Sequence, residues 1–176
     1  IEHSSIRRLF FPLVVISIAL VSNAATYYVD GGSGSDSNAG TLSAPFRTLG
    51  KAAGVVSNGD TVRLLSDVIA HDIWFSQAIT LDSYDSNWLA TVDCDSSGGG
   101  IYIPSGTIKH IRFQNTWGNE HSSVGSAILI GSGGATIEDC VFYQCFNNLS
   151  GAAVHSLGTL TVRRCSFESC EATGEY

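Results

Sequence analysis

The sequence predicts an all-β fold, a parallel β-helix in which short strands stack coil upon coil. Charged residues make up only 14% of the 176-residue chain, whereas 19 glycines favour turns and short strands over long helices. A short unit recurs without an internal gap from Ile108, Ile137 and Val162, at intervals of 29 and 25 residues. Such periods are typical of stacked repeats, in which each unit buries its apolar face against its neighbours.

The composition predicts one acidic domain. Hydrophobic residues form 44% of the chain, which is enough for a sizeable core, and the formal net charge is −7. Nucleic-acid binding draws most of its affinity from clustered Lys and Arg. We therefore expect no nucleic-acid partner.

The first 24 residues have the pattern of a signal peptide. Arg7 and Arg8 precede an uncharged apolar run over residues 9–21, and small residues end the segment at Ala24. The apolar run is shorter than the roughly 20 residues that a helix needs to span a membrane. We expect cleavage after Ala24, no membrane span in the mature chain, and a secreted or cell-surface protein.

The two ends of the sequence suggest a partial product. The chain contains no methionine, begins at Ile1, and stops at Tyr176, a few positions into what would be the next unit. We expect further coils beyond Tyr176, so that the predicted β-helix is truncated at its C-terminus.

Residues 25–58 are expected to form an N-terminal cap on the coils. Thr26–Val29 has the composition of a strand, and residues 30–40 that of a Gly/Ser/Asp/Asn loop. Ser43 is a candidate N-cap for one short helix that ends near Gly59. Five apolar residues fall on one face of this helix: Phe46, Leu49, Ala52, Ala53 and Val56.

Residues 59–176 are expected to form the coils. Short apolar runs between turn residues predict four strands, at 61–65, 73–81, 89–92 and 100–103. Each copy of the repeated unit follows a glycine-led element, whose apolar part begins at Ile101, Ile128 and Val154. The variable stretches 117–124 and 146–150 are expected to be loops on one side of the stack, where a binding surface most easily lies.

Stacked coils place equivalent residues about 4.8 Å apart, so the repeat predicts ladders of side chains. One inward ladder is aromatic, and two outward ladders alternate in charge from coil to coil. These ladders are Phe113, Phe142 and Phe167; Lys109, Glu138 and Arg163; and His110, Asp139 and Arg164.

Two motifs resemble known families. The opening from Tyr27 to Thr41, followed by Ala44-Pro-Phe-Arg-Thr-Leu-Gly-Lys-Ala-Ala53 and Gly59-Asp-Thr-Val62, is similar to the N-terminal cap of pectate-lyase-like β-helices. The Gly-x-Ala-Ile/Val element with its following Phe-x-x-Cys/Thr resembles the repeats of polymorphic outer-membrane proteins. The resemblance implies a right-handed parallel β-helix at the cell surface or outer membrane. Those repeats usually place Asn after the Phe, whereas this chain has Thr116, Cys145 and Cys170.

The five cysteines leave two interpretations open. Cys140 and Cys165 occupy the apolar position of Ile111, which favours packing as small hydrophobic residues in the interior. In an exported protein, stacked cysteines also suit disulfides. The geometrically sensible pairs are Cys140 with Cys165 and Cys145 with Cys170, which leaves Cys94 unpaired.

The sequence nominates no catalytic residue and no cofactor. Asp36 lies in a partial calcium-binding turn, and Asp93 and Asp95 flank Cys94, so these three are weak candidates for calcium ligands. Arg163 and Arg164 are neighbours, and a strand would direct them to opposite faces unless a turn intervenes. Their acidic ladder partners favour a structural role.

Trp117, Tyr102 and Tyr143 are candidates for stacking on sugars, and Asn148 begins a glycosylation sequon if the source is eukaryotic. The repeat without catalytic residues predicts an adhesin-like or structural module that binds glycans or surface proteins through its lateral face and loops. The cap resemblance supports an alternative, the N-terminal fragment of a polysaccharide lyase or glycoside hydrolase whose catalytic coils are missing.

Overall fold

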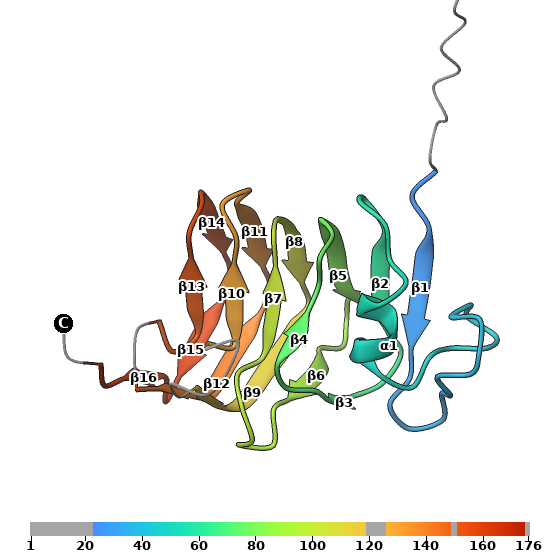
Figure 1. Cartoon of the computed structure of the whole chain (residues 1–176). Helices are drawn as coiled ribbons and strands as arrows, with labels where there is room; N and C mark the ends of the chain where they lie inside the picture. The colour runs from blue at the N-terminus through green and yellow to red at the C-terminus, as the bar shows by residue number, and fades with distance from the viewer. Residues whose placement is uncertain (1–22, 119–125, 149–150, 175–176) are drawn as a thin grey trace, which may run out of the picture.

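The computed structural model describes residues 23–118, 126–148 and 151–174, which form a β-solenoid of parallel stacked coils with one short helix (Figure 1). The predicted all-β fold class is confirmed. No helix among these residues is long and apolar enough to cross a membrane. The predicted signal peptide, apart from Asn23 and Ala24, lies outside the described residues.

Three parallel sheets run along the solenoid. Sheet A comprises β1 (Thr26–Val29), β2 (Thr61–Leu64), β5 (Ile79–Ser83), β8 (Gly106–Lys109), β11 (Ala135–Glu138) and β14 (Leu160–Arg163). Sheet B comprises β4 (Ile73–Trp74), β7 (Ile101–Ile103), β10 (Ile128–Ile130) and β13 (Val154–Ser156). Sheet C comprises β3 (Val68–Ile69), β6 (Ala90–Asp93), β9 (Ile111–Gly118), β12 (Val141–Asn147) and β15 (Ser166–Glu168), and β16 (Glu171–Ala172) also pairs with β12.

Among the described residues, the cap contains the single helix, α1 (Leu49–Ala53). It begins later than predicted and ends at Ala53, before the predicted end near Gly59. Ser43 is not its N-cap. Phe46 is in extended backbone, because its N–H donates to the Tyr28 carbonyl at 2.9 Å and it bridges to Val29 of β1. Thr48 is the N-cap instead, and its hydroxyl accepts the Lys51 N–H at 3.1 Å.

The predicted strand at 73–81 is wrong, because it is two strands in different sheets. β4 belongs to sheet B and β5 to sheet A, and the fully buried Phe75 lies between them. An apolar run turns a corner here without any Gly or Pro to mark it. The two-residue β3 was also not predicted.

The repeat has the register that the alignment predicts. Ile137 pairs with Ile108 on one side and with Val162 on the other. The three glycine-led elements become β7, β10 and β13, with Ile101, Ile128 and Val154 on one row. The aromatic ladder is confirmed too, since the Phe142 ring stacks on Phe113 at 5.6 Å and on Phe167 at 4.9 Å between centroids.

A single residue with positive φ turns the chain from sheet A into sheet C. His110, Asp139 and Arg164 hold this corner at φ values of 54°, 53° and 51°. Asn, Asp and His tolerate the left-handed region better than most residues, whereas Arg gains no such advantage. The corner brings neighbouring side chains together, so Arg163 and Arg164 both reach Glu138, at 2.9 and 3.5 Å.

All five cysteines are free in the structure. Cys94, Cys140 and Cys145 are buried in the core, and burial raises the pKa of Cys140 and of Cys145 to about 12. Cys165 and Cys170 are half-buried, one rung further along. The three buried thiols occupy interior positions, and the two members of each candidate disulfide pair lie on adjacent rungs.

Candidate functional site

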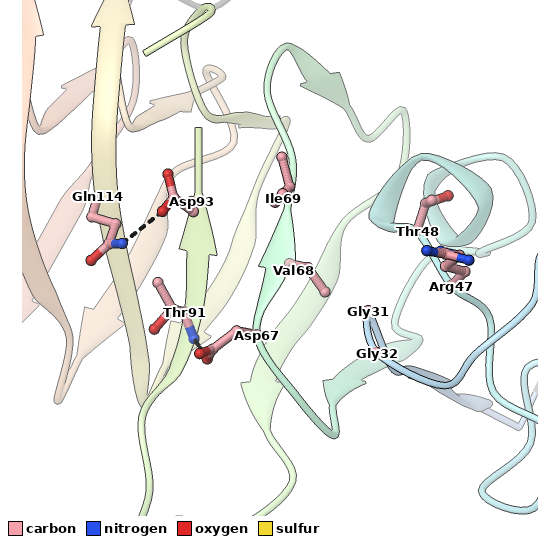
Figure 2. Close-up of a pocket in the computed structure, with 10 residues that line it drawn as sticks. All are labelled: Gly31, Gly32, Arg47, Thr48, Asp67, Val68, Ile69, Thr91, Asp93 and Gln114. Carbon is pink, nitrogen blue, oxygen red and sulfur yellow. Dashed lines mark hydrogen bonds between the residues drawn. The ribbon is translucent and has the colours of Figure 1, made fainter. Parts of the chain in front are cut away.

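A cleft of about 440 Å³ opens on the lateral face of the solenoid, where the cap meets sheet C (Figure 2). We call it the cap cleft. Its lining comes from the cap loop, the start of α1 and the outer face of three sheet C strands. The lining residues are Gly31, Gly32, Arg47, Thr48, Asp67, Val68, Ile69, Thr91, Asp93 and Gln114.

Asp30 fixes the loop at one rim of the cap cleft. Its Oδ1 accepts the backbone N–H groups of Gly32 and Ser33, both at 3.0 Å, and the Ser66 hydroxyl at 2.7 Å. Hydrogen bonds, above all from the Ser33 hydroxyl, lower the pKa of Asp30 to about 2. The loop that the sequence marks only by its composition is therefore held by an ionised carboxylate.

Gly31 has a role that no other residue fits. A Cβ at this position would lie 2.3 Å from the Asp67 carbonyl oxygen. The cap backbone thus packs directly against the turn between β2 and β3. This contact fixes the cap loop beside sheet C at one end of the cleft.

Asp36 positions the start of α1. Its Oδ1 accepts the N–H groups of Arg47 and Thr48 at 2.9 and 3.0 Å, and its Oδ2 accepts the Thr48 hydroxyl at 2.8 Å. Although its partial burial acts to raise the pKa of Asp36, the hydrogen bonds from Thr48 outweigh it and lower the pKa. The side chain therefore tethers the cap loop to the helix, and it does not line the cleft.

The sheet C side of the cleft carries two carboxylates. Asp93 Oδ2 accepts Gln114 Nε2 at 2.7 Å, and Asp93 Oδ1 accepts the Asp95 N–H at 2.9 Å. Burial acts to raise the pKa of Asp93, but these hydrogen bonds outweigh it and lower the pKa. Asp67 Oδ1 accepts the Thr91 N–H at 2.7 Å, as Figure 2 shows.

The three calcium candidates are not brought together. Asp93 and Asp95 remain neighbours on one turn, and Asp36 lies on the cap loop. Within the described ranges, no group of three or more His, Cys, Asp or Glu side chains could hold a metal ion.

A polar row continues from the cleft along sheet C. Arg112 Nε donates to Gln114 Oε1 at 2.9 Å, and the Arg112 guanidinium lies 4.7 Å from the Tyr143 ring centroid. Asp93, Gln114, Arg112 and Tyr143 are thus linked across three coils. Tyr143, a candidate for stacking on sugars, has an arginine over its ring.

The other two aromatic candidates lie elsewhere. Tyr102 stacks on Trp74 at 3.8 Å on the outer face of sheet B. Trp117 is 54% exposed and lines a separate hollow of about 310 Å³ with Phe146 and Glu171. Asn148 borders the same hollow, while Ser150 of its sequon lies outside the described residues.

The predicted charge ladder is confirmed and extends further than predicted. In register along sheet A, Arg63, Asp82 and Lys109 precede Glu138 and Arg163, so the sign alternates over five rungs. The Asp82 side chain, only 7% exposed, lies 3.5 Å from Lys109 Nζ and 2.9 Å from His110 Nδ1. Aligning Thr61-Val-Arg and Thr80-Leu-Asp with Thr107-Ile-Lys would have found it.

Comparisons with known proteins add no relative. No family model, no curated protein and no solved structure matches the chain. The chain is therefore characterised by its β-solenoid fold and by the cap cleft on its lateral face.

Proposed function

We propose that the chain is an exported β-solenoid module, secreted or displayed at the cell surface, that binds a glycan in the cap cleft. The observation that carries the proposal is the mixed lining of the cleft. Asp67 supplies acceptors, Arg47 supplies donors, and Gln114 supplies both, beside Ile69, which is 73% exposed. Sugars present adjacent hydroxyls and apolar ring faces, so they suit a site of this composition.

The cleft is also preorganised. Asp30 and Asp36 fix the cap rim through backbone hydrogen bonds, and Asp93 is held by Gln114 and Asn115 on the opposite side. A site whose walls are already ordered loses little conformational entropy when a ligand binds.

The proposal includes export of the chain and a relationship to known β-helix families. The leader over residues 1–24 supports secretion, and the cap and repeat motifs support a relationship to pectate-lyase-like β-helices and polymorphic outer-membrane repeats. An adhesin-like role follows from these features, with a surface glycan as the ligand.

A glycoside hydrolase is the second candidate, favoured by the presence of two carboxylates, Asp67 and Asp93, in one cleft. The lowered pKa of Asp93 keeps this carboxylate ionised, as a base or nucleophile requires. Release of reducing sugar from a polysaccharide panel, abolished by Asp67→Asn, would support this candidate.

The binding proposal is tested with an oligosaccharide panel and isothermal titration calorimetry on the full chain. Arg47→Ala and Ile69→Ala should each weaken binding, because both side chains line the cleft. Neither side chain holds the cap loop in place, so the cleft itself should stay intact. Arg163→Ala, on sheet A, is the matched arginine control and should bind like the wild type. Equal affinity in all three variants, or no glycan bound at all, would contradict the proposal.

A further inference from the structure

Sheet A carries an unbroken row of threonines on its outer face. One threonine occupies the same register position in each of the six strands. These strands lie side by side from the cap to the last described coil (Figure 1). The row consists of Thr26, Thr61, Thr80, Thr107, Thr136 and Thr161.

Strand stability alone does not require threonine at every rung. The next outward row on the same strands is not constant, and runs from Tyr28 through Arg63 and Asp82 to Arg163. Val and Ile have equal or higher strand preference and would stack as well. What threonine adds is a hydroxyl and a methyl group at each rung.

The hydroxyls of this row are available to a ligand. Among the described residues, none of the six donates or accepts a side-chain hydrogen bond within the protein. Mostly small residues flank the row on the side away from the charged ladder: Gly59, Ala78, Ser105, Gly134 and Thr159. A hollow of about 290 Å³ lies beside Thr136 and Thr161, and its lining includes three glycines, Gly106, Gly133 and Gly134.

The charged ladder borders this face without dominating it. Asp82 is paired with Arg63 and Lys109, at 3.9 and 3.5 Å, and Glu138 is paired with Arg163 at 2.9 Å. The charges therefore largely neutralise one another along one edge. The threonine row and the row of small residues form the uncharged strip.

The spacing indicates the kind of ligand. Adjacent parallel strands lie about 4.8 Å apart, so the strip presents hydroxyl and methyl groups at a fixed short repeat. A small molecule would contact only one or two rungs. A threonine repeated on every rung of the sheet matches a ligand whose own structure repeats. The hydroxyl spacing is close to the shortest lattice repeat of water molecules in ice. We propose that the threonine row and its small-residue flank bind ice.

The test is inhibition of ice recrystallisation and thermal hysteresis, measured on the purified full chain. The wild type should keep ice grains small and open a gap between melting and freezing points. Thr107→Tyr with Thr136→Tyr should abolish both effects, because the bulky rings would hold the strip away from the lattice. Ser166→Tyr on sheet C is the matched control and should retain them.

Thr107→Val with Thr136→Val keeps shape and strand preference, so it tests the face even if the tyrosine variant fails to fold. Its activity should fall below that of the wild type. Wild-type hysteresis no greater than that of serum albumin at equal concentration would overturn the proposal. Equal activity in the wild type and every sheet A variant would also overturn it. Neither result bears on the cap cleft, which lies on another face.

Discussion

Sheets A and C belong to the same coils, yet their outer faces differ. On sheet A the threonine row is constant, and the neighbouring row alternates in charge. On sheet C the outward row changes at every rung, from Ile69 through Asp93 and Gln114 to Tyr143 and Glu168, and the face is hollowed beside the cap. The shared core fixes the register of both sheets and leaves the outer rows free. A constant row suits a periodic ligand, and a varied row suits a local one.

The largest effect is expected in the core that both faces share. Phe142 is fully buried and stacks between Phe113 and Phe167. Phe142→Ala should lower the free energy of unfolding by about 3–5 kcal/mol, because it removes a large buried side chain and leaves a cavity. Urea denaturation followed by circular dichroism measures the loss.

The matched control is Phe167→Ala. The Phe167 side chain belongs to the same ladder but is 51% exposed, so its truncation should cost clearly less. Equal losses for the two variants would show that the ladder does not stack as described.

The charge ladder should contribute unequally along its length. Asp82→Asn leaves Arg63, Lys109 and His110 without their nearly buried anion and should cost about 1–3 kcal/mol. Glu138→Gln removes the partner of the more exposed Arg163 and should cost less than about 1 kcal/mol. Urea denaturation in low and high salt measures the loss of stability in each variant. A greater loss for Glu138→Gln than for Asp82→Asn would contradict the larger contribution of Asp82.

A smaller, pH-dependent effect is expected at the cleft rim. The pKa of Asp30 is lowered from 3.8 to about 2, so folding favours its ionised form. Its stabilisation is complete above about pH 4 and is lost as pH falls through about 2. Asp30→Asn should therefore be less stable than the wild type at neutral pH and should approach it near pH 2.

Unfolding curves at several pH values measure this convergence. Ser66→Ala removes one hydrogen bond to Asp30 and should show the same trend at smaller size. A constant difference between Asp30→Asn and the wild type across the acid range would contradict the role of the carboxylate.

Most of the fold could be predicted because the repeated units can be aligned in the sequence without a gap. The aligned units gave the correct pairing of Ile108, Ile137 and Val162, and with it the aromatic and charge ladders. The sequence does not fix the start of the helix, because Ser43 and Thr48 are both acceptable caps and only the pairing of Phe46 with β1 decides between them. The corner at Phe75 has no turn residue to reveal it.

The cap cleft could not be predicted in the same way. Its lining comes from five separate stretches, around residues 31, 47, 67, 91 and 114, and it needs the register of the first coils. The sequence does not reveal that register, because β2 and β5 share with the later units only a short Thr-x-charged pattern. The sequence marks Asp93 only as a weak candidate for a calcium ligand, and its hydrogen bond from Gln114 is evident only in the structure.

Amide chemical-shift mapping of the ¹⁵N-labelled chain during glycan titration tests the division between the two faces most directly. The largest perturbations should fall on Gly31, Gly32, Thr91 and Gln114, around the cap cleft, while Thr107 and Thr136 stay unchanged. Perturbations centred on the threonine row, with the cleft unaffected, would contradict the account.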